Sequence, residues 1–391
     1  MMTEWTRRSF LSRAGIIGCS AAASPLLTPV SFAAAPWDAR LVVIVLRGGL
    51  DGLDAVQPYG DPNWSGLRHR LAGGPENGAS DLDGFFALHP AMAPLMPLWQ
   101  AGELAFHHAV STPYRDKRSH FDGQDLLEAG AQTLADGVRD GWLNRMLQSM
   151  DGVHTDTAYA IGRSDMLLLR GAASVANWSP DADLNLSPQA RKLMAMVMED
   201  DPELHAALSE AELLSLETGQ DGRSKSKGHV QIAEFAAKRL RKDARIAAFS
   251  LNGWDTHQNQ HRLLTPALGR LSDVLLTLKA DLTGPVWNKT AVVAMTEFGR
   301  TARENGTGGT DHGTGGLAIL AGGAVRGGTV HGHWPGLAQA DLYQGRDLMP
   351  VRDVRAIPAW IMRGLFGLDR NTLETKVFPG LDIGSDPDLV R

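Results

Sequence analysis

Cysteine is almost absent from this sequence. One residue in 391 is a cysteine, Cys19, and it lies near the N-terminus. The chain beyond that residue therefore has no disulfides and no thiolate ligands for a metal. Any metal site in the rest of the chain has to use oxygen and imidazole ligands instead.

The sequence also lacks a long apolar run and an excess of positive charge. No apolar segment is long enough for an ordinary membrane span, so we expect no transmembrane anchor in the mature chain. The formal net charge is -6 and no basic stripe is present, which argues against nucleic acid as a partner. With 43% hydrophobic residues, the chain can still bury a substantial core.

The N-terminal residues 1–33 are typical of an export signal. The segment TRRSFL at positions 6–11 is a twin-arginine motif, and SFA at positions 31–33 is a small-x-small cleavage site. We therefore predict a periplasmic or secreted protein that leaves by the twin-arginine route. The alternative is an ordinary amphipathic N-terminal helix. Because this route carries folded proteins, it often goes with a metal or cofactor loaded in the cytoplasm.

Short apolar runs separated by helical and glycine-rich segments predict an α/β fold. The runs typical of buried strands are residues 41–46, 104–110, 245–251, 291–295 and 317–320. We expect a single α/β domain over residues 34–391. The region of about 131–242 is less regular, and we interpret it as an insertion or lid on that domain.

Carboxylates and imidazoles follow several of these predicted strands. Asp51, Asp255 and Glu297 each come directly after a strand, and His257 and His312 lie in the same polar clusters. Strand ends meet at one edge of a parallel sheet, so these side chains are expected to converge. Oxygen and imidazole ligands suit one or two divalent ions, namely zinc, manganese, calcium or magnesium. The alternative is that these residues cap turns and helices, Asp51 in particular.

A dense polar patch at residues 114–122 precedes a predicted helix. Ser119 lies at the junction, where it is either a nucleophile facing the helix dipole or the N-cap of the helix. His120 is a candidate acid or base. An anionic substrate oxygen would be held by an arginine, either Arg47, Arg118 or Arg300.

The chain resembles a known family at these residues. The segments LRGGLDGLD, YRDKRSHFDGQD, GWDTH, TEFGRT and GTDHGTGG occur together in domain-of-unknown-function family 1501. That family looks like a distant relative of the alkaline phosphatase/sulfatase superfamily. The resemblance implies a mostly parallel, alkaline-phosphatase-like sheet flanked by helices, with a helical insertion. The metal ligands and the catalytic group that it implies are Asp51, Asp255, His257, Glu297 and His312, with Ser119 as nucleophile.

The chain departs from the superfamily pattern at two positions. Asn259 stands where a histidine ligand is usual, and Phe298 replaces the histidine of an Asp-His pair. We expect His257, His261 or Asp311 to compensate as metal ligands. Without compensation, only one metal site remains, or none that supports catalysis.

These observations lead to one expectation with two alternatives. We expect an exported, metal-dependent hydrolase of phosphate or sulfate esters, with Arg300 steadying the anionic ester. The first alternative is a non-catalytic exported protein that binds or assembles with another exported protein. The second is a metal-independent hydrolase that uses Ser119 and a histidine, although no Gly-x-Ser-x-Gly elbow frames that serine.

Overall fold

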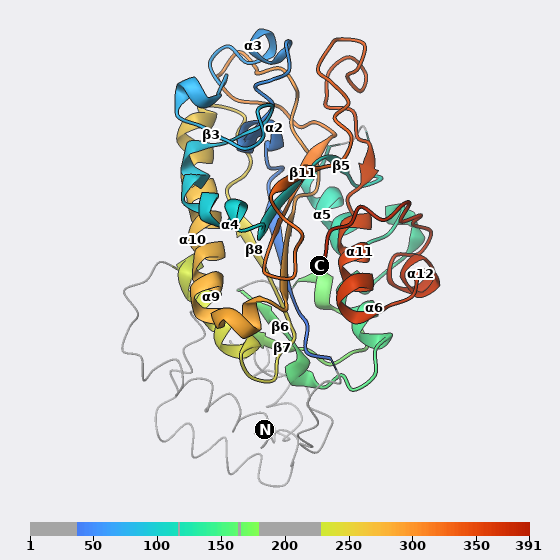
Figure 1. Cartoon of the computed structure of the whole chain (residues 1–391). Coiled ribbons are helices and arrows are strands. Elements are labelled where there is room, and N and C mark those ends of the chain that lie inside the picture. The colour runs from blue at the N-terminus through green and yellow to red at the C-terminus, as the bar shows by residue number, and fades with distance from the viewer. Residues whose placement is uncertain (1–36, 116–117, 163–165, 180–227) are drawn as a thin grey trace, which may run out of the picture.

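The computed structural model describes residues 37–115, 118–162, 166–179 and 228–391 (Figure 1). The predicted export signal, residues 1–33, lies outside the described residues. Among the residues that are described, no helix is both long enough and apolar enough to cross a membrane.

A mostly parallel sheet of nine strands forms the centre of the described chain, as the sequence predicted. Its order is β11-β5-β10-β9-β1-β8-β6-β7, and β12 also pairs with β5. Only β10 runs antiparallel to its neighbours, β5 and β9. The strands are β1 (Arg40–Arg47), β5 (Leu104–Ser111), β6 (Ala158–Ile161), β7 (Ala176–Trp178), β8 (Ile246–Asn252), β9 (Thr290–Met295), β10 (Gly316–Ala321), β11 (Thr329–His331) and β12 (Arg352–Asp353).

Helices cover both faces of this sheet (Figure 1). On one face, Val42, Ile44 and Leu46 of β1 belong to the same core cluster as residues of α9 (Gly228–Leu240) and α10 (Gln260–Trp287). The intervening residues of β1 belong to the cluster on the other face, with α6 (Trp142–Gln148) and α11 (Ala356–Phe366). Successive side chains of a strand point to opposite faces, so a strand buried on both faces reads as a continuous apolar run.

Shorter elements complete the described chain. A small antiparallel sheet has the order β2-β4-β3. Its strands are β2 (Val56–Gln57), β3 (Ser80–Asp81) and β4 (Ala87–Leu88). The remaining helices are α2 (Gly52–Ala55), α3 (Trp64–Leu67), η1 (Pro75–Asn77), η2 (Pro90–Leu95), α4 (Met96–Gln100), α5 (His120–Ala129), η3 (Leu134–Asp136), η4 (Thr155–Thr157), η5 (Leu167–Leu169), α12 (Arg370–Thr372) and η6 (Leu373–Val377).

The region that we interpreted as an insertion, about 131–242, differs from that expectation in its described parts. β6 pairs in parallel with β8, and β7 extends the same sheet beyond β6. α9, at the end of the region, packs against α10. These parts therefore belong to the main sheet and its helical cover, while residues 180–227 lie outside the described residues.

The ends of β1, β8 and β9 lie together because β1 pairs in parallel with both other strands. Gly48 and Gly49 follow β1 with φ values of 123° and 68°, which side chains rarely adopt. A Cβ atom on Gly48 would lie 2.7 Å from the backbone nitrogen of Asp255. Glycine at this position therefore lets the loop after β1 touch the loop after β8, and the polar residues of both loops share one edge of the sheet.

Candidate metal centre

Asp255 lies at the centre of the polar site. It comes three residues after the end of β8, and its side chain is 46% exposed. The guanidinium group of Arg300 donates a hydrogen bond to its Oδ1 atom at 2.7 Å. Partial burial opposes ionisation, but this hydrogen bond and the charge of Arg300 hold the pKa of Asp255 below its ordinary value. Asp255 therefore presents a carboxylate to the site at neutral pH.

His120, the first residue of α5, faces Asp255 with an unpaired nitrogen. Its Nδ1 atom lies 2.7 Å from Oε1 of the buried Glu297. Burial disfavours the ionised form of Glu297 and so raises its pKa. Hydrogen bonds from His120 and Gln124 outweigh this effect and hold the pKa of Glu297 below the ordinary value. An ionised Glu297 accepts the proton of Nδ1, so in the neutral imidazole it is Nε2 that has the lone pair. That Nε2 atom is buried, has no hydrogen-bond partner among the described residues and lies 3.4 Å from Oδ2 of Asp255.

His312 repeats the same arrangement from another loop. Its Nδ1 atom donates to the carbonyl oxygen of Arg118 at 2.8 Å. Its Nε2 atom therefore carries a lone pair, 3.4 Å from Oδ1 of Asp255. Burial lowers the pKa of His312, the charge of Arg300 lowers it further, and the backbone hydrogen bond only partly offsets them. The imidazole is therefore neutral at physiological pH, as a metal ligand must be.

His257 is the third imidazole of the site. Its Nδ1 atom lies 3.1 Å from Oδ1 of Asp311, and its Nε2 atom lies 3.1 Å from Oδ1 of Asp255. The same Nε2 atom lies 2.9 Å from Nε2 of His312. If Asp311 and Arg118 hold the Nδ1 protons, two lone pairs face each other at this distance. Such a contact is favourable only when a proton or a metal cation lies between the nitrogens.

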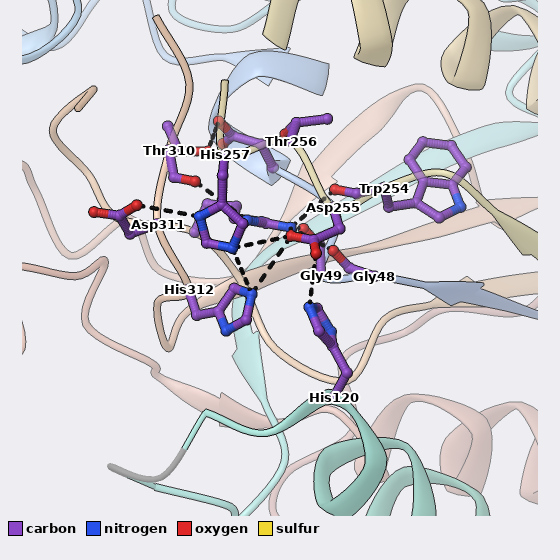
Figure 2. Close-up of polar contacts among 12 residues, drawn as sticks. Gly48, Gly49, His120, Trp254, Asp255, Thr256, His257, Thr310, Asp311 and His312 are labelled. Atoms are coloured by element: carbon purple, nitrogen blue, oxygen red, sulfur yellow. Dashed lines mark hydrogen bonds and ion pairs between the residues drawn. The ribbon is translucent and has the colours of Figure 1, made fainter. Parts of the chain in front are cut away.

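We call His120, Asp255, His257 and His312 the His–Asp cluster. Figure 2 shows the four side chains pointing toward one another from three separate segments. One ligand atom each of His120, Asp255 and His312 lies within 4.8 Å of the others. Tetrahedral zinc with bonds near 2.0–2.1 Å holds its ligand atoms about 3.3 Å apart. The contact of 3.4 Å between His312 and Asp255 is close to this spacing, and His257 lies 2.9 Å from His312 but is not one of the three residues that share the 4.8 Å limit.

Glu297 and Asp311, both predicted as metal ligands, lie behind the histidines instead. Each accepts a hydrogen bond from a cluster imidazole, Glu297 from His120 and Asp311 from His257. Partial burial opposes the charge of Asp311, but Asn305 and His257 hold its pKa below the ordinary value. A carboxylate on Nδ1 fixes the ring orientation and the tautomer of a metal-binding histidine. Both residues therefore orient imidazoles of the cluster.

Asp51, also predicted as a ligand, is outside the cluster. Its side chain is fully buried, and Arg68 donates to both of its oxygens at 2.7 and 3.2 Å. Gln260 donates a further hydrogen bond at 2.7 Å. Burial opposes ionisation, but the charge of Arg68 holds the pKa of Asp51 below its ordinary value. A guanidinium group therefore neutralises Asp51, and the aspartate caps α2, which was the alternative interpretation.

Arg300 was predicted to steady an anionic substrate, and the geometry contradicts that role. The residue is 1% exposed. Its guanidinium group donates to Asp255 and to the backbone carbonyls of Gly49, Trp254 and Thr310. These bonds tie together the loops after β1, β8 and β9. Arg300 therefore organises the site, and its donors are directed at the protein itself.

Ser119 has the geometry of a helix N-cap. Its backbone is extended, and its hydroxyl oxygen accepts a hydrogen bond from the backbone nitrogen of Asp122 at 3.5 Å.

The other two arginines considered for anion binding are paired, as Arg300 is. Arg118 donates to Asp347 at 3.1 Å, and Arg47 donates to Gln124 at 2.7 Å.

The two departures from the superfamily pattern have clear structural consequences. Asn259 precedes α10 in a left-handed conformation with φ 48° and lies outside the His–Asp cluster. Phe298 is buried, and its ring lies 4.9 Å from the rings of both His120 and His312. An apolar ring therefore borders the cluster at position 298. His120 supplies a third imidazole instead, and sequence reasoning had assigned it an acid or base role rather than a ligand role.

Comparison with solved structures finds distant likenesses. The chain is 12% identical to a protein in the alkaline phosphatase superfamily from Vibrio parahaemolyticus, with a TM-score of 0.39, covering 97% of this chain and 80% of that one. For the alkaline phosphatase from the Antarctic bacterium TAB5, identity is 10% and the TM-score is 0.35, covering 74% of this chain and 92% of that one. For the PsFucS1 sulfatase from Pseudoalteromonas sp., identity is 13% and the TM-score is 0.38, covering 90% of this chain and 74% of that one. These scores are low, so the chemistry has to be derived from this chain's own residues.

Sequence comparison gives a firmer assignment. No curated protein matches the chain. A family model does match it, over residues 38–357, which is most of its length. The chain belongs to the family described as protein of unknown function (DUF1501).

Proposed function

We propose that this protein is a metal-dependent hydrolase of phosphate or sulfate esters. Its metal centre is the His–Asp cluster. The observation that carries the proposal is the orientation of the three imidazoles. Each has its Nδ1 atom held by a protein acceptor, and each directs Nε2 toward the carboxylate of Asp255. This arrangement leaves lone pairs facing one another, which a cation stabilises.

The chemistry of the donor set favours zinc. Three imidazole nitrogens and one carboxylate oxygen suit zinc or another first-row transition metal, whereas calcium and magnesium prefer oxygen ligands. Manganese is the next candidate. We propose a single ion, because the buried Arg68 already compensates the charge of Asp51, one of the carboxylates that the sequence predicted as a ligand.

Two side chains of the cluster are accessible to solvent. The side chains of Asp255 and His257 are 46% and 43% exposed. When bound, a divalent ion supplies Lewis-acid polarisation of an ester oxygen and makes water a stronger nucleophile. Phe121, directly after His120 and 84% exposed, offers an apolar surface for the organic part of the ester. Glu297, Asp311 and the carbonyl of Arg118 hold the imidazoles in place during this chemistry.

Water is the nucleophile that fits this site best. The hydroxyl oxygen of Ser119 already accepts the capping hydrogen bond of α5. We therefore propose that Ser119 positions the helix that carries His120, in place of the nucleophilic role that the sequence suggested.

We further propose that the protein works after export, in the periplasm or outside the cell. The twin-arginine motif and the cleavage site at residues 31–33 support this localisation. Twin-arginine export of a folded chain fits a protein that receives its metal before transport. An exported partner protein remains the expectation of the non-catalytic alternative.

Metal-dependent hydrolysis provides the test. The purified protein is stripped of metal, reloaded with zinc or manganese, and assayed on p-nitrophenyl phosphate and p-nitrophenyl sulfate. We expect activity that depends on the added metal. The variant His312→Ala should lose about 100-fold or more of kcat/KM, because several kcal/mol of transition-state stabilisation is removed.

The matched control is His333→Ala, which removes an exposed histidine outside the cluster and should keep full activity. Metal binding without turnover of either ester class would favour the non-catalytic alternative. Activity that survives complete chelation would favour a metal-independent hydrolase.

A further inference from the structure

A buried network of polar side chains adjoins the His–Asp cluster, and Gln260 is at its centre. Gln260 is the first residue of α10, and it is fully buried. Its amide nitrogen donates to Oδ2 of Asp51 at 2.7 Å and to Oδ2 of Asp54 at 2.8 Å. Its amide oxygen accepts from the hydroxyl of Thr256 at 3.0 Å and from that of Thr310 at 2.7 Å. Both donors and both acceptor positions of the amide are therefore used.

These partners fix the direction in which the amide of Gln260 points. If the amide were turned over, its oxygen would face the carboxylates of Asp51 and Asp54 in place of the two N–H donors. Asp51 is itself anchored by Arg68, which also donates to two backbone carbonyls of the loop after β9. A buried polar group whose hydrogen bonds are all made is held rigidly. The amide oxygen is therefore kept in one place.

The two threonines that donate to this oxygen belong to the loops that carry the cluster (Figure 2). Thr256 lies between Asp255 and His257 in the chain, and Thr310 lies two residues before His312. Both threonines are fully buried. The backbone nitrogen of Thr310 also donates to the carbonyl oxygen of Thr256 at 3.2 Å. The shared amide therefore ties the loop of Asp255 and His257 to the loop of His312.

The spacing of these two loops decides how well the cluster can hold an ion. The Nε2 atoms of His257 and His312 lie 2.9 Å apart, and both approach Oδ1 of Asp255, at 3.1 and 3.4 Å. The ligand atoms of a tetrahedral zinc ion lie about 3.3 Å apart, so a small shift of one loop changes the fit. Changes behind the ligands of a metal lower its affinity about 10- to 100-fold.

We propose that Gln260 is a positioning residue of the metal centre, which sets the spacing of the two ligand loops through Thr256 and Thr310. This inference rests on the proposed function, because it concerns the geometry of the proposed metal centre. It also gives Asp51 a role. Together with Arg68, Asp51 anchors the amide nitrogen, so that the amide oxygen stays directed at the two threonines.

Thr256→Val tests the connection, because valine has nearly the shape of threonine but lacks the hydroxyl. Zinc affinity, measured by competition with a chromophoric chelator, should fall about tenfold. Thr256→Ser keeps the hydroxyl and should keep most of the affinity. Wild-type affinity in Thr256→Val would overturn the proposal. An equal loss in the valine and serine variants would overturn it as well, because the hydroxyl would then not be what matters.

The matched control is Thr290→Val. Thr290 is also fully buried, and its hydroxyl donates to the carbonyl oxygen of Val286 at 2.8 Å, at the start of β9 and far along the strand from the cluster. Its loss should lower stability to urea much as Thr256→Val does and leave zinc affinity unchanged. If zinc affinity falls equally in both variants, the effect is a general loss of stability and the proposal is wrong.

Gln260→Met assigns the effect to the amide itself. Its loss of zinc affinity and that of Thr256→Val should not add in the double variant, because both changes break the same connection. Additive losses would show that the threonine acts independently of Gln260. Gln260→Met leaves two carboxylates without a donor, so its fold is checked first by circular dichroism. If it does not fold, Thr310→Val takes its place in the same double variant.

A measurement on metal-free protein separates this proposal from the proposed function. Nitrogen–proton NMR of histidine side chains reports the tautomer and the surroundings of each ring. Thr256→Val should shift the signals of His257 and His312 and leave those of His107 and His108 in place, whereas Thr256→Ser should keep the wild-type spectrum. If the wild-type protein binds no zinc, the proposed function fails. The spectra still decide the positioning role, and unshifted signals in Thr256→Val would overturn it.

Discussion

At the scale of single residues, the partner of each Nδ1 atom decides what a histidine in this site can do. Three imidazoles have this nitrogen bound to Glu297, Asp311 or the carbonyl of Arg118. In the neutral imidazole the opposite nitrogen, Nε2, then has a lone pair. A metal ion binds through that lone pair, and a nitrogen that carries a proton cannot supply it. These three acceptors therefore fix the orientation of the imidazoles in the site.

Glu297→Gln tests this role. The glutamine oxygen takes the position that accepts from the backbone nitrogen of Gly48, from Gln124 and from Nδ1 of His120, but it carries no negative charge. His120 is therefore held less firmly and becomes a less basic ligand. We expect zinc affinity to fall about 10- to 100-fold, as for other changes behind a metal ligand. The measurement is zinc affinity by competition with a chromophoric chelator.

The control for this variant is Glu103→Gln. Glu103 pairs with Lys279 and Trp287 at the opposite end of β5, so its loss should not change zinc affinity. Equal affinity of Glu297→Gln and the wild-type protein would show that Glu297 does not orient a ligand. Complete loss of metal binding, with the fold intact, would return Glu297 to the ligand role that the sequence suggested.

The sequence predicted His257, Asp255 and His312 as ligands because each lies in a polar cluster close to a strand end. It did not predict the role of His120, because nothing local indicates which side chain faces Glu297 from a position 177 residues away. Asp51 shows the same limit. Its position after β1 is typical of a ligand, but Arg68 occupies its carboxylate, and only the folded chain shows that contact.

At the scale of secondary structure, α5 connects the features of the site. Its first residue is His120, its third turn carries the buried Glu128, which pairs with Arg47, and Ser119 caps its N-terminus. The sequence left Ser119 open between a nucleophile and a cap. The extended backbone of Ser119 and its bond from the backbone of Asp122 favour the cap.

Two substitutions of Ser119 separate these roles. Ser119→Asn keeps a good capping side chain and removes the hydroxyl, so we expect wild-type stability and activity within a few fold. Ser119→Ala should lower the free energy of unfolding by about 1 kcal/mol through loss of the cap. Stability is measured by urea denaturation and activity on the ester that the protein turns over best.

A hydroxyl nucleophile would give the opposite pattern. Ser119→Asn would then be stable but inactive, and Ser119→Ala would be inactive out of proportion to its small loss of stability. Trapping a phosphorylated Ser119 during turnover would contradict water as the nucleophile directly.

At the scale of the whole molecule, the central sheet was predictable and its edge was not. The buried runs that became β1, β5, β8, β9 and β10 are continuous and apolar because both faces of those strands are covered. β6 and β7 were missed because they have only four and three residues and lie in a stretch without clear periodicity. Short strands depend on their neighbours in the sheet more than on their own sequence.

The folded molecule also buries two adjacent histidines of β5, and this makes its stability depend on pH. Burial lowers the pKa of His107 and of His108 to about 4, from an ordinary value of 6.5. Between these values the unfolded chain binds protons that the folded protein does not. The free energy of unfolding should therefore fall as pH drops from 6.5 toward 4, by about 1.4 kcal/mol per pH unit for each histidine.

Urea denaturation at several pH values checks this slope. In His108→Gln, one of the histidines with a lowered pKa is gone, so the free energy of unfolding should fall less steeply with acid, whatever the stability of the variant at pH 7. An unchanged slope in this variant would show that His108 is protonated at the same pH in the folded and unfolded states.

The central claim is that the His–Asp cluster binds a divalent metal, and the metal content of the protein tests it most directly. Protein purified without chelator, exposed to zinc and then dialysed, is analysed by inductively coupled plasma mass spectrometry. We predict about one ion per chain in the wild-type protein and in His333→Ala, and almost none in the double variant His120→Ala/His312→Ala. A wild-type protein without bound metal, or a double variant that holds as much as the wild type, would contradict the account.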